Sequence, residues 1–253
     1  MRRLLARLVL LATPLLLVAG PALAGHFVIG VEDVDYAPIM SVSGGEFRGY
    51  ARELLDLFAR RQGHQFEYRP LPTRRLVIEH MAGRLDLVFP DNPNWNAQAK
   101  QDARLAYSEP TVPFQDVVMV LPERRNLPLH TLGVVRGYTP KRFLPQIEAG
   151  SLHVNEAADP GRLIRMTLTG RVDGTHVALP VALYQLERLG RPGALVPSTA
   201  LAPTTLEYHY RLSSVKHVEL IAQFDRFLRE EQAALAVLQR RYGLDDKLGA
   251  VHP

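Results

Sequence analysis

Residues 83–100, GRLDLVFPDNPNWNAQAK, begin as a buried strand and end as a polar loop. The strand is marked by Leu85 and by residues 87–89, which are apolar enough for the interior of a sheet. The chain then passes through residues 90–96, where prolines, asparagines and the only tryptophan of the protein, Trp95, interrupt the pattern. Because such residues mark turns and loops, the strand is expected to open here into a loop of amides and one large aromatic side chain.

The segments that precede this stretch alternate between strand and helix patterns. Residues 26–31 and 65–71 have the apolar or alternating pattern of strands, and residues 50–61 carry leucine and phenylalanine at helical spacing. A second helix is expected over residues 74–82, directly before the strand at 83–89. This β-α-β-α-β order predicts an α/β fold, an open sheet with helices on its faces.

A second unit of the same kind follows. Strands are expected at residues 115–121, 132–135, 152–154 and 172–179, and helices at 160–169 and 181–189. After a further strand at 206–212, residues 215–242 are expected to form one long amphipathic helix that packs back onto an earlier domain. Two α/β units in series predict two lobes.

The first 24 residues have the pattern of a secretory signal peptide. Three arginines within the first seven residues precede an apolar run over 8–18 and the small-residue ending Ala22-Leu23-Ala24. The run is too short for a membrane span, and the alternative is an uncleaved N-terminal anchor. With no cysteine in the chain, disulfides, thiolate metal sites and a lipid-modified cysteine are excluded. We therefore expect an exported, periplasmic protein that starts near Gly25.

Charge and motifs exclude several other classes of function. Without the predicted signal peptide, 27 Lys+Arg face 26 Asp+Glu, a formal charge of +1, and the arginine pairs are scattered along the chain. No nucleic-acid partner is therefore expected. No two histidines lie three to five residues apart, and no phosphate-binding loop or nucleophile motif is present, so we expect no metal, no cofactor and no enzyme activity.

Seven short phrases, in this order, resemble the bacterial extracellular solute-binding proteins of family 3, the polar amino-acid receptor type. They are residues 31–38 with YAP, Gly49-Tyr50 and the helix after it, GRLDLV at 83–88, YSEP at 107–110, GVVRGYT at 133–139, GRVDG at 170–174 and RRYGL at 240–244. The resemblance covers essentially the whole mature chain. It implies the type II periplasmic binding protein fold, two lobes joined by a two-strand hinge.

The resemblance also implies boundaries and partners. Lobe 1 would comprise residues 25–113 and, after the chain returns, residues 207–253 with the C-terminal helix. Lobe 2 would comprise residues 114–206, with hinge strands near 110–117 and 204–211. A small solute would bind in the cleft and the lobes would close over it, as periplasmic binding proteins do. The partner would be an ABC-type permease or a membrane sensor, and the protein is expected to be a monomer.

The clamp that such receptors use for amino acids is missing. Relatives that bind amino acids usually carry an arginine before YSEP, which holds the ligand carboxylate, and an acid after the GRVD strand, which takes the ammonium. These positions fall at Lys100 or Gln101 and at Ala178 or Leu179. Because an unpaired buried charge costs several kcal/mol, an ordinary zwitterionic amino acid is not expected as the ligand.

Nine residues in loops at the carboxyl ends of strands are candidates for binding the ligand, because ligands of open α/β sheets lie there. They are Asp35, Tyr36, Arg75, Asn92, Asn94, Trp95, Arg136, Tyr138 and Thr139. Either candidate arginine could replace the missing carboxylate clamp, the tyrosine at 36 and the tryptophan could stack on the ligand, and the remaining residues could form hydrogen bonds with it. Surface exposure or packing in the core is the structural alternative for each.

Three functions remain open at this point. The first is a periplasmic receptor that delivers a small polar solute to an ABC-type importer. The second is a protein of the same fold that signals to a membrane sensor, and the missing clamp favours it mildly. The third is a cleft enzyme of the dehydratase type, for which Asp33, Asp35 or Asp91 could supply the acid.

Overall fold

The computed structural model describes residues 24–245 with the exception of 102 and 201–207. The predicted signal peptide, apart from its last residue, and the predicted tail from 246 onward lie outside the described residues, as does the beginning of the strand expected at 206–212. Among the described residues, no helix is both long enough and apolar enough to cross a membrane.

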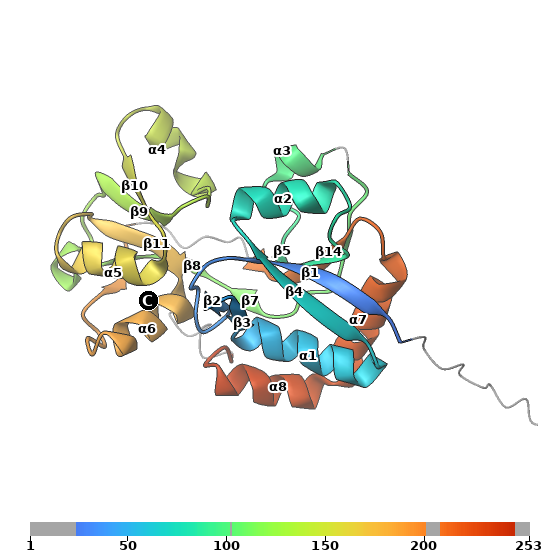
Figure 1. The fold of residues 1–253 in the computed structure, drawn as a ribbon. Coiled ribbons are helices and arrows are strands. Elements are labelled where there is room, and N and C mark those ends of the chain that lie inside the picture. Colours follow the sequence, from blue (N-terminus) through green and yellow to red (C-terminus); the bar gives the residue numbers. More distant parts are fainter. Residues whose placement is uncertain (1–23, 102, 201–207, 246–253) are drawn as a thin grey trace, which may run out of the picture.

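Two α/β bodies lie side by side, each built on its own five-stranded sheet (Figure 1). We call lobe 1 the body with strand order β4-β1-β5-β14-β6 and lobe 2 the body with order β10-β9-β11-β8-β12. The strands of lobe 1 are β1 (His26–Glu32), β4 (Gln65–Leu71), β5 (Leu87–Asp91), β6 (Ala106–Tyr107) and β14 (Arg211–Ser214). Those of lobe 2 are β8 (Asp116–Val120), β9 (Thr131–Val135), β10 (His153–Ala157), β11 (Gly174–Ala178) and β12 (Val196–Pro197).

The sheet of lobe 1 brings the ends of two strands to one edge. Strand β1 is parallel to β4 along its whole length and parallel to β5, with Gly30 opposite Val88. The carboxyl ends of β1 and β5, Glu32 and Asp91, therefore lie at the same edge of the sheet. Strand β14 arrives from the C-terminal part of the chain and pairs antiparallel with both β5 and β6. Lobe 1 is thus completed by a segment more than a hundred residues away in sequence.

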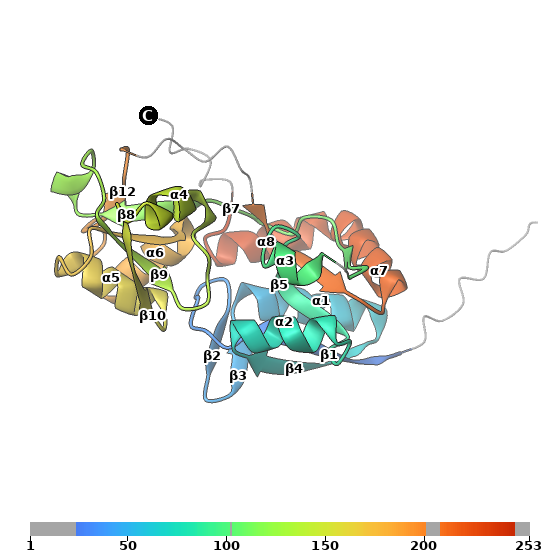
Figure 2. The ribbon, with the colours of Figure 1, turned by 90° about the horizontal axis from the view of Figure 1, so that it is seen from above.

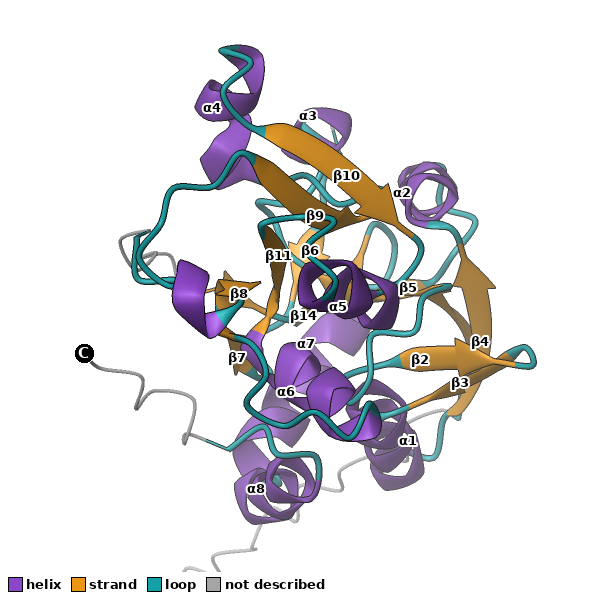
Figure 3. Cartoon of the chain, turned by 90° about the vertical axis from the view of Figure 1, so that its left-hand side faces the viewer, coloured by secondary structure: helices purple, strands orange, loops and turns teal. Residues whose placement is uncertain are grey.

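Helices cover both sheets. The helices of the described chain are α1 (Tyr50–Gln62), α2 (Thr73–Met81), α3 (Ala97–Lys100), α4 (Leu144–Glu148), α5 (Pro160–Leu168), α6 (Leu179–Arg188), α7 (Val218–Glu230) and α8 (Gln232–Arg241), with short 3-10 turns η1 (Pro122–Arg124) and η2 (Lys141–Phe143). In lobe 2, α5 and α6 lie against the sheet (Figure 3). The helices and strands fall close to where the periodicity of the sequence placed them.

Two short strands connect the lobes. Strand β7 (Pro113–Phe114) carries the chain from lobe 1 to lobe 2, and β13 (Tyr208–His209) lies on the way back. The two pair antiparallel, with Tyr208 opposite Phe114, and Figure 2 shows β7 between the two bodies. A small hairpin of β2 (Ser41–Ser43) and β3 (Glu46–Arg48) precedes α1.

Two of the sequence-based boundaries were wrong. The helix expected over 215–242 is two helices, α7 and α8, which meet at Glu231, where the backbone has φ −101° and ψ 21°. No glycine or proline marks this break, so the amphipathic pattern looked continuous. An unbroken helix of that length would run straight for about 42 Å, whereas the bend lets both helices contact α1. Strand β5 also continues through Pro90 to Asp91, because β14 pairs with Asp91.

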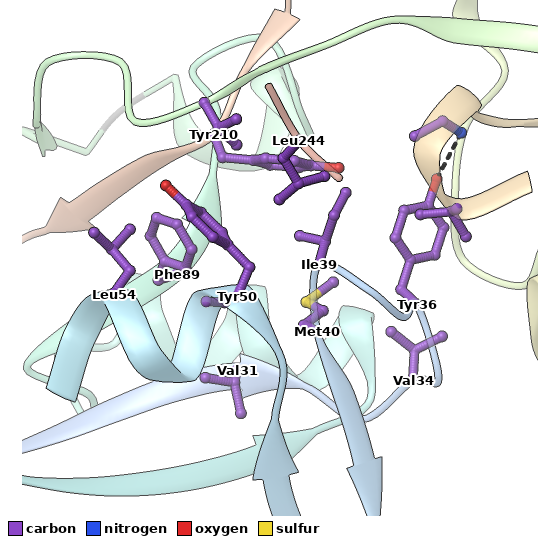
Figure 4. Close-up of a cluster of buried hydrophobic side chains, with 14 of the residues drawn as sticks. Val31, Val34, Tyr36, Ile39, Met40, Tyr50, Leu54, Phe89, Tyr210 and Leu244 are labelled. Carbon is purple, nitrogen blue, oxygen red and sulfur yellow. Dashed lines mark hydrogen bonds between the residues drawn. The ribbon is translucent and has the colours of Figure 1, made fainter. Parts of the chain in front are cut away.

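One cluster of buried apolar side chains runs through both lobes. From lobe 1 it includes Ile39, Tyr50 and Phe89, and from lobe 2 it includes Ala178 and Val181. Figure 4 shows part of this cluster, in which Tyr50 lies beside Leu54 and Phe89, and Tyr36 reaches towards lobe 2. The two lobes therefore share apolar contacts as well as the connecting strands.

The packing of α7 can be tested with Phe224, which is fully buried. Its ring centroid lies 5.0 Å from that of Phe58 and 5.8 Å from that of Phe227. F224A should lower the free energy of unfolding by about 3–5 kcal/mol, because it removes a buried ring and leaves a cavity. V218A, in the same helix at a residue that is 59% exposed, is the matched control and should change it by less than about 0.5 kcal/mol. Urea unfolding measures both, and equal effects would contradict this packing.

Candidate functional site

A small pocket lies at the carboxyl ends of β1 and β5 in lobe 1. Its cavity volume is about 20 Å³, and it is partly open to solvent. Its lining residues are Glu32, Thr73, Leu76, Val77, His80, Val88, Pro90, Asp91, Trp95, Asn96 and Lys100. Space of this size holds about one water-sized group. Helix α2 contributes four residues at i, i+3, i+4 and i+7, which is one face of a helix.

Glu32, the last residue of β1, is a buried carboxyl at this pocket. It is 7% exposed and accepts a hydrogen bond of 2.7 Å from the hydroxyl of Tyr138 in lobe 2. Burial raises the pKa of Glu32, and the nearby Asp91 acts in the same direction. Hydrogen bonds from Tyr138 and Thr73 and the charge of Lys100 act the other way without reversing the shift. A further charge that enters the pocket would therefore shift the pKa of Glu32 again.

Asp91 and Lys100 form a buried ion pair beside Glu32. The Lys100 ammonium donates to Oδ1 of Asp91 and, at 3.0 Å, to the carbonyl of Asn92, and both charged side chains are only 7% exposed. The aspartate also accepts a hydrogen bond from the Asn92 amide at 2.7 Å. Lys100 occupies one of the two positions at which relatives usually carry the arginine that holds the ligand carboxylate. Here its charge is balanced within the protein rather than left for a ligand carboxylate.

His80 and Ser213 extend this network, and the hydrogen bonds define the histidine tautomer. Ser213 donates its hydroxyl hydrogen to Oδ2 of Asp91 at 2.7 Å, because an ionised carboxylate only accepts. The Ser213 oxygen must then accept the 2.9 Å bond from Nε2–H of His80. The other ring nitrogen, Nδ1, is a bare acceptor, and it has no hydrogen-bond partner among the described residues. Burial lowers the pKa of His80 to about 4, so the ring is neutral at pH 7.

Two tyrosines join the lobes next to the pocket. Tyr36, in the loop after β1, is 5% exposed, and its hydroxyl accepts a 3.0 Å hydrogen bond from the backbone amide of Ala178 in lobe 2, drawn as a dashed line in Figure 4. Its ring lies 5.7 Å from that of Tyr138. Gly137, with φ +87°, brings lobe 2 close to the start of α2, since a Cβ there would lie 3.4 Å from Thr73. The lobes thus touch directly at the edge of the sheet that bears the pocket.

Two further contacts between the lobes are at the surface. Asp35 forms an ion pair with Arg188 of α6 at 3.1 Å, with side-chain exposures of 41% and 52%. Lys141 donates to the carbonyl of Asn94. Exposed ion pairs of this kind contribute about 0–1 kcal/mol, so the less exposed contacts of Tyr36 and Tyr138 carry more of the association of the lobes.

The asparagine loop has mixed roles. Asn92 is buried, donates to the carbonyl of His209 at 2.9 Å and accepts from the amide of Asn94, so its side chain shapes the loop. Trp95 lines the pocket and packs edge-on against Tyr210, with ring centroids 5.9 Å apart. Of the loop residues among the candidates, the structure therefore brings only Trp95 to the pocket.

The remaining candidates lie away from the pocket lining. Arg75 is on the exposed side of α2, where its Nε is 3.6 Å from Glu79 and its side chain is 68% exposed. Arg136 is 70% exposed, with its Nε 3.9 Å from Glu156. Thr139 is exposed as well. The structure does not bring either arginine beside Lys100, and a role for them in binding stays a prediction.

The sequence reading missed Glu32 and His80 and undervalued Lys100. Glu32 directly follows the apolar strand expected at residues 26–31, and an acid at that position is expected at the ligand edge of the sheet. His80 is seven residues after Thr73 and four after Leu76, so it shares their inward face. Among the described residues, no group of three or more metal-ligating side chains is found.

Comparisons with known structures define the class of fold. No protein-family model and no curated protein match the sequence. The structure is similar to two-lobed periplasmic binding protein-like folds, and the predicted α/β fold of that class is confirmed. All three of the solved structures described next are below 25% sequence identity, so they show the fold alone.

A sensor domain and a substrate-binding protein of a transporter occur among these structures. One is a histidine kinase sensor domain with similarity to periplasmic binding proteins (TM-score 0.68, 19% identity, covering 85% of this chain and 95% of that chain). A second is the amino acid ABC transporter substrate-binding protein AbpA from Streptococcus pneumoniae, bound to L-arginine (0.67, 18%, 86% and 94%). A third is the VFT2 domain of BvgS from Bordetella pertussis (0.65, 21%, 86% and 93%).

The buried, neutral state of His80 gives the site a defined pH dependence. As the pH falls from 7 to 4, the unfolded chain protonates this histidine near its ordinary pKa of 6.5, whereas the folded protein does so only near 4. The wild type should therefore lose about 3 kcal/mol more stability over this range than H80Q, whose amide can still donate to Ser213. Urea unfolding between pH 4 and 7 measures the difference, and parallel curves for the two proteins would contradict the assignment.

Proposed function

We propose that this protein is a periplasmic solute-binding protein that captures a small polar solute between its two lobes, for an ABC-type importer. The observation that carries the proposal is the Glu32–Tyr138 hydrogen bond. It links the buried polar pocket of lobe 1 to lobe 2, so a solute that enters the pocket changes the contact between the lobes. Solute-induced closure of two lobes is the established motion of this fold.

We propose that the predicted lobe boundaries separate the two parts of the chain that move relative to each other. Residues 25–113 and 207–253 would move as one lobe and residues 114–206 as the other. The pair of β7 and β13, at Pro113–Phe114 and Tyr208–His209, would act as the hinge, because it carries both connections between the sheets. Its two short strands offer little resistance to rotation compared with the five-stranded sheets on each side.

The second candidate function is a ligand sensor that signals to a membrane partner. One of the similar structures is a histidine kinase sensor domain, which supports this candidate alongside transport. The two functions share the same pocket and differ in what recognises the closed form. A permease and an ATPase encoded beside the gene would favour transport, and a sensor kinase would favour signalling. The expectation that the protein is not an enzyme stays a prediction.

Trp95, the only tryptophan, reports directly on solute capture because it lines the pocket and contacts Tyr210. Small molecules released by denaturing the purified protein should change Trp95 fluorescence saturably when they are added back to protein refolded without them. Mass spectrometry of the same fraction identifies the compound. A fraction that holds no enriched compound and leaves the fluorescence unchanged would contradict solute capture.

A further inference from the structure

We propose that the pocket binds a primary ammonium group, so that the solute is an amine that carries its positive charge between Glu32 and Nδ1 of His80. This inference rests on the proposed solute-binding function and names the chemical class of the solute. It differs from the amino-acid expectation in requiring no carboxylate on the ligand.

The charges of the pocket favour a cation. Lys100 balances Asp91, and the neutral ring of His80 adds no charge. When Glu32 is ionised, it is the one unbalanced charge among the residues that line the pocket. A cation beside it would offset the cost of burying that carboxylate, whereas an anion would raise the cost.

The hydrogen-bonding groups favour a donor. His80 is 2% exposed, its Nδ1 is an acceptor without a partner among the described residues, and the residue lines the pocket. Glu32 also presents carboxylate oxygens there, which accept from the hydroxyls of Tyr138 and Thr73 and have lone pairs left for further donors. A buried acceptor without a donor is costly, so a ligand that brings N–H groups would supply a partner to the histidine nitrogen and a further donor to the carboxylate.

The size of the pocket selects among cations. A cavity of about 20 Å³ has room for about one water-sized group. A primary ammonium is of that size and has three N–H donors, whereas a carboxylate or a guanidinium is larger. Trp95 and Asn96, which also line the pocket, are less buried than Glu32 and His80. The remaining atoms of the amine would therefore extend out of the pocket past these two residues.

Three probes with the same five-carbon chain separate charge from size: cadaverine with two ammonium groups, glutarate with two carboxylates, and pentane-1,5-diol with two hydroxyls. The full mature protein is equilibrated by dialysis against an equimolar mixture at pH 7.5, in a buffer free of primary amines, and retained probes are quantified by mass spectrometry. Cadaverine should be retained, and glutarate and the diol should not.

Variants assign the binding to the pocket. E32Q keeps the size and an acceptor for Tyr138 but removes the charge, and it should lower cadaverine affinity about tenfold or more. H80Q keeps the donor to Ser213 but removes the Nδ1 acceptor, and it should lower affinity as well. E67Q is the matched control, because Glu67 is an exposed glutamate on the neighbouring strand β4. It should bind cadaverine as the wild type does.

The outcomes distinguish this inference from the proposed function. Retention of glutarate or of the diol at the level of cadaverine, or no retention of cadaverine, would overturn the ammonium site. Equal affinity of E32Q and wild type would do the same. In each of these cases solute capture still stands if released molecules change Trp95 fluorescence, and it falls only if they do not.

Discussion

The site is constrained by a carboxyl group buried at the end of β1. Taking Glu32 out of water is unfavourable unless other groups supply hydrogen bonds or charge. The hydroxyls of Tyr138 and Thr73 supply hydrogen bonds, from lobe 2 and from the start of α2. The environment of one side chain therefore depends on the strand, the helix and the second lobe being in place together. Any change at this carboxyl alters a contact between the lobes.

The neighbouring ion pair explains why Lys100 does not pair with Glu32. Lys100, at one of the positions where relatives carry the clamping arginine, donates to Asp91 and to a backbone carbonyl. Asp91 in turn accepts from Ser213, which makes His80 donate and leaves its Nδ1 as an acceptor. The buried network thus leaves acceptors as the dominant groups of the site, in agreement with the missing carboxylate clamp. Removing one member of a buried ion pair costs about 3–5 kcal/mol of stability. Single substitutions at Asp91 or Lys100 are therefore expected to destabilise the protein.

The sequence predicted the fold far better than the site. Alternating periods located most strands and helices. Trp95, a candidate for stacking on the ligand, lines the pocket, and its contact with a ligand stays a prediction. The break at Glu231 could not be predicted, because no glycine or proline marks it. Glu32 and His80 were missed because their importance comes from partners far away in sequence, Tyr138 and Ser213. Exposed arginines such as Arg75 were candidates because a sequence shows the charge of a residue but not its burial.

The most direct test of the account is the protonation of Glu32, followed by ¹³C NMR of its carboxyl group, with E32Q to assign the signal. We expect a pKa of Glu32 above the ordinary 4.5 in the free protein, because burial dominates, and a lower pKa when cadaverine saturates the pocket, because a cation favours the carboxylate. A pKa at or below 4.5 that cadaverine leaves unchanged would contradict it.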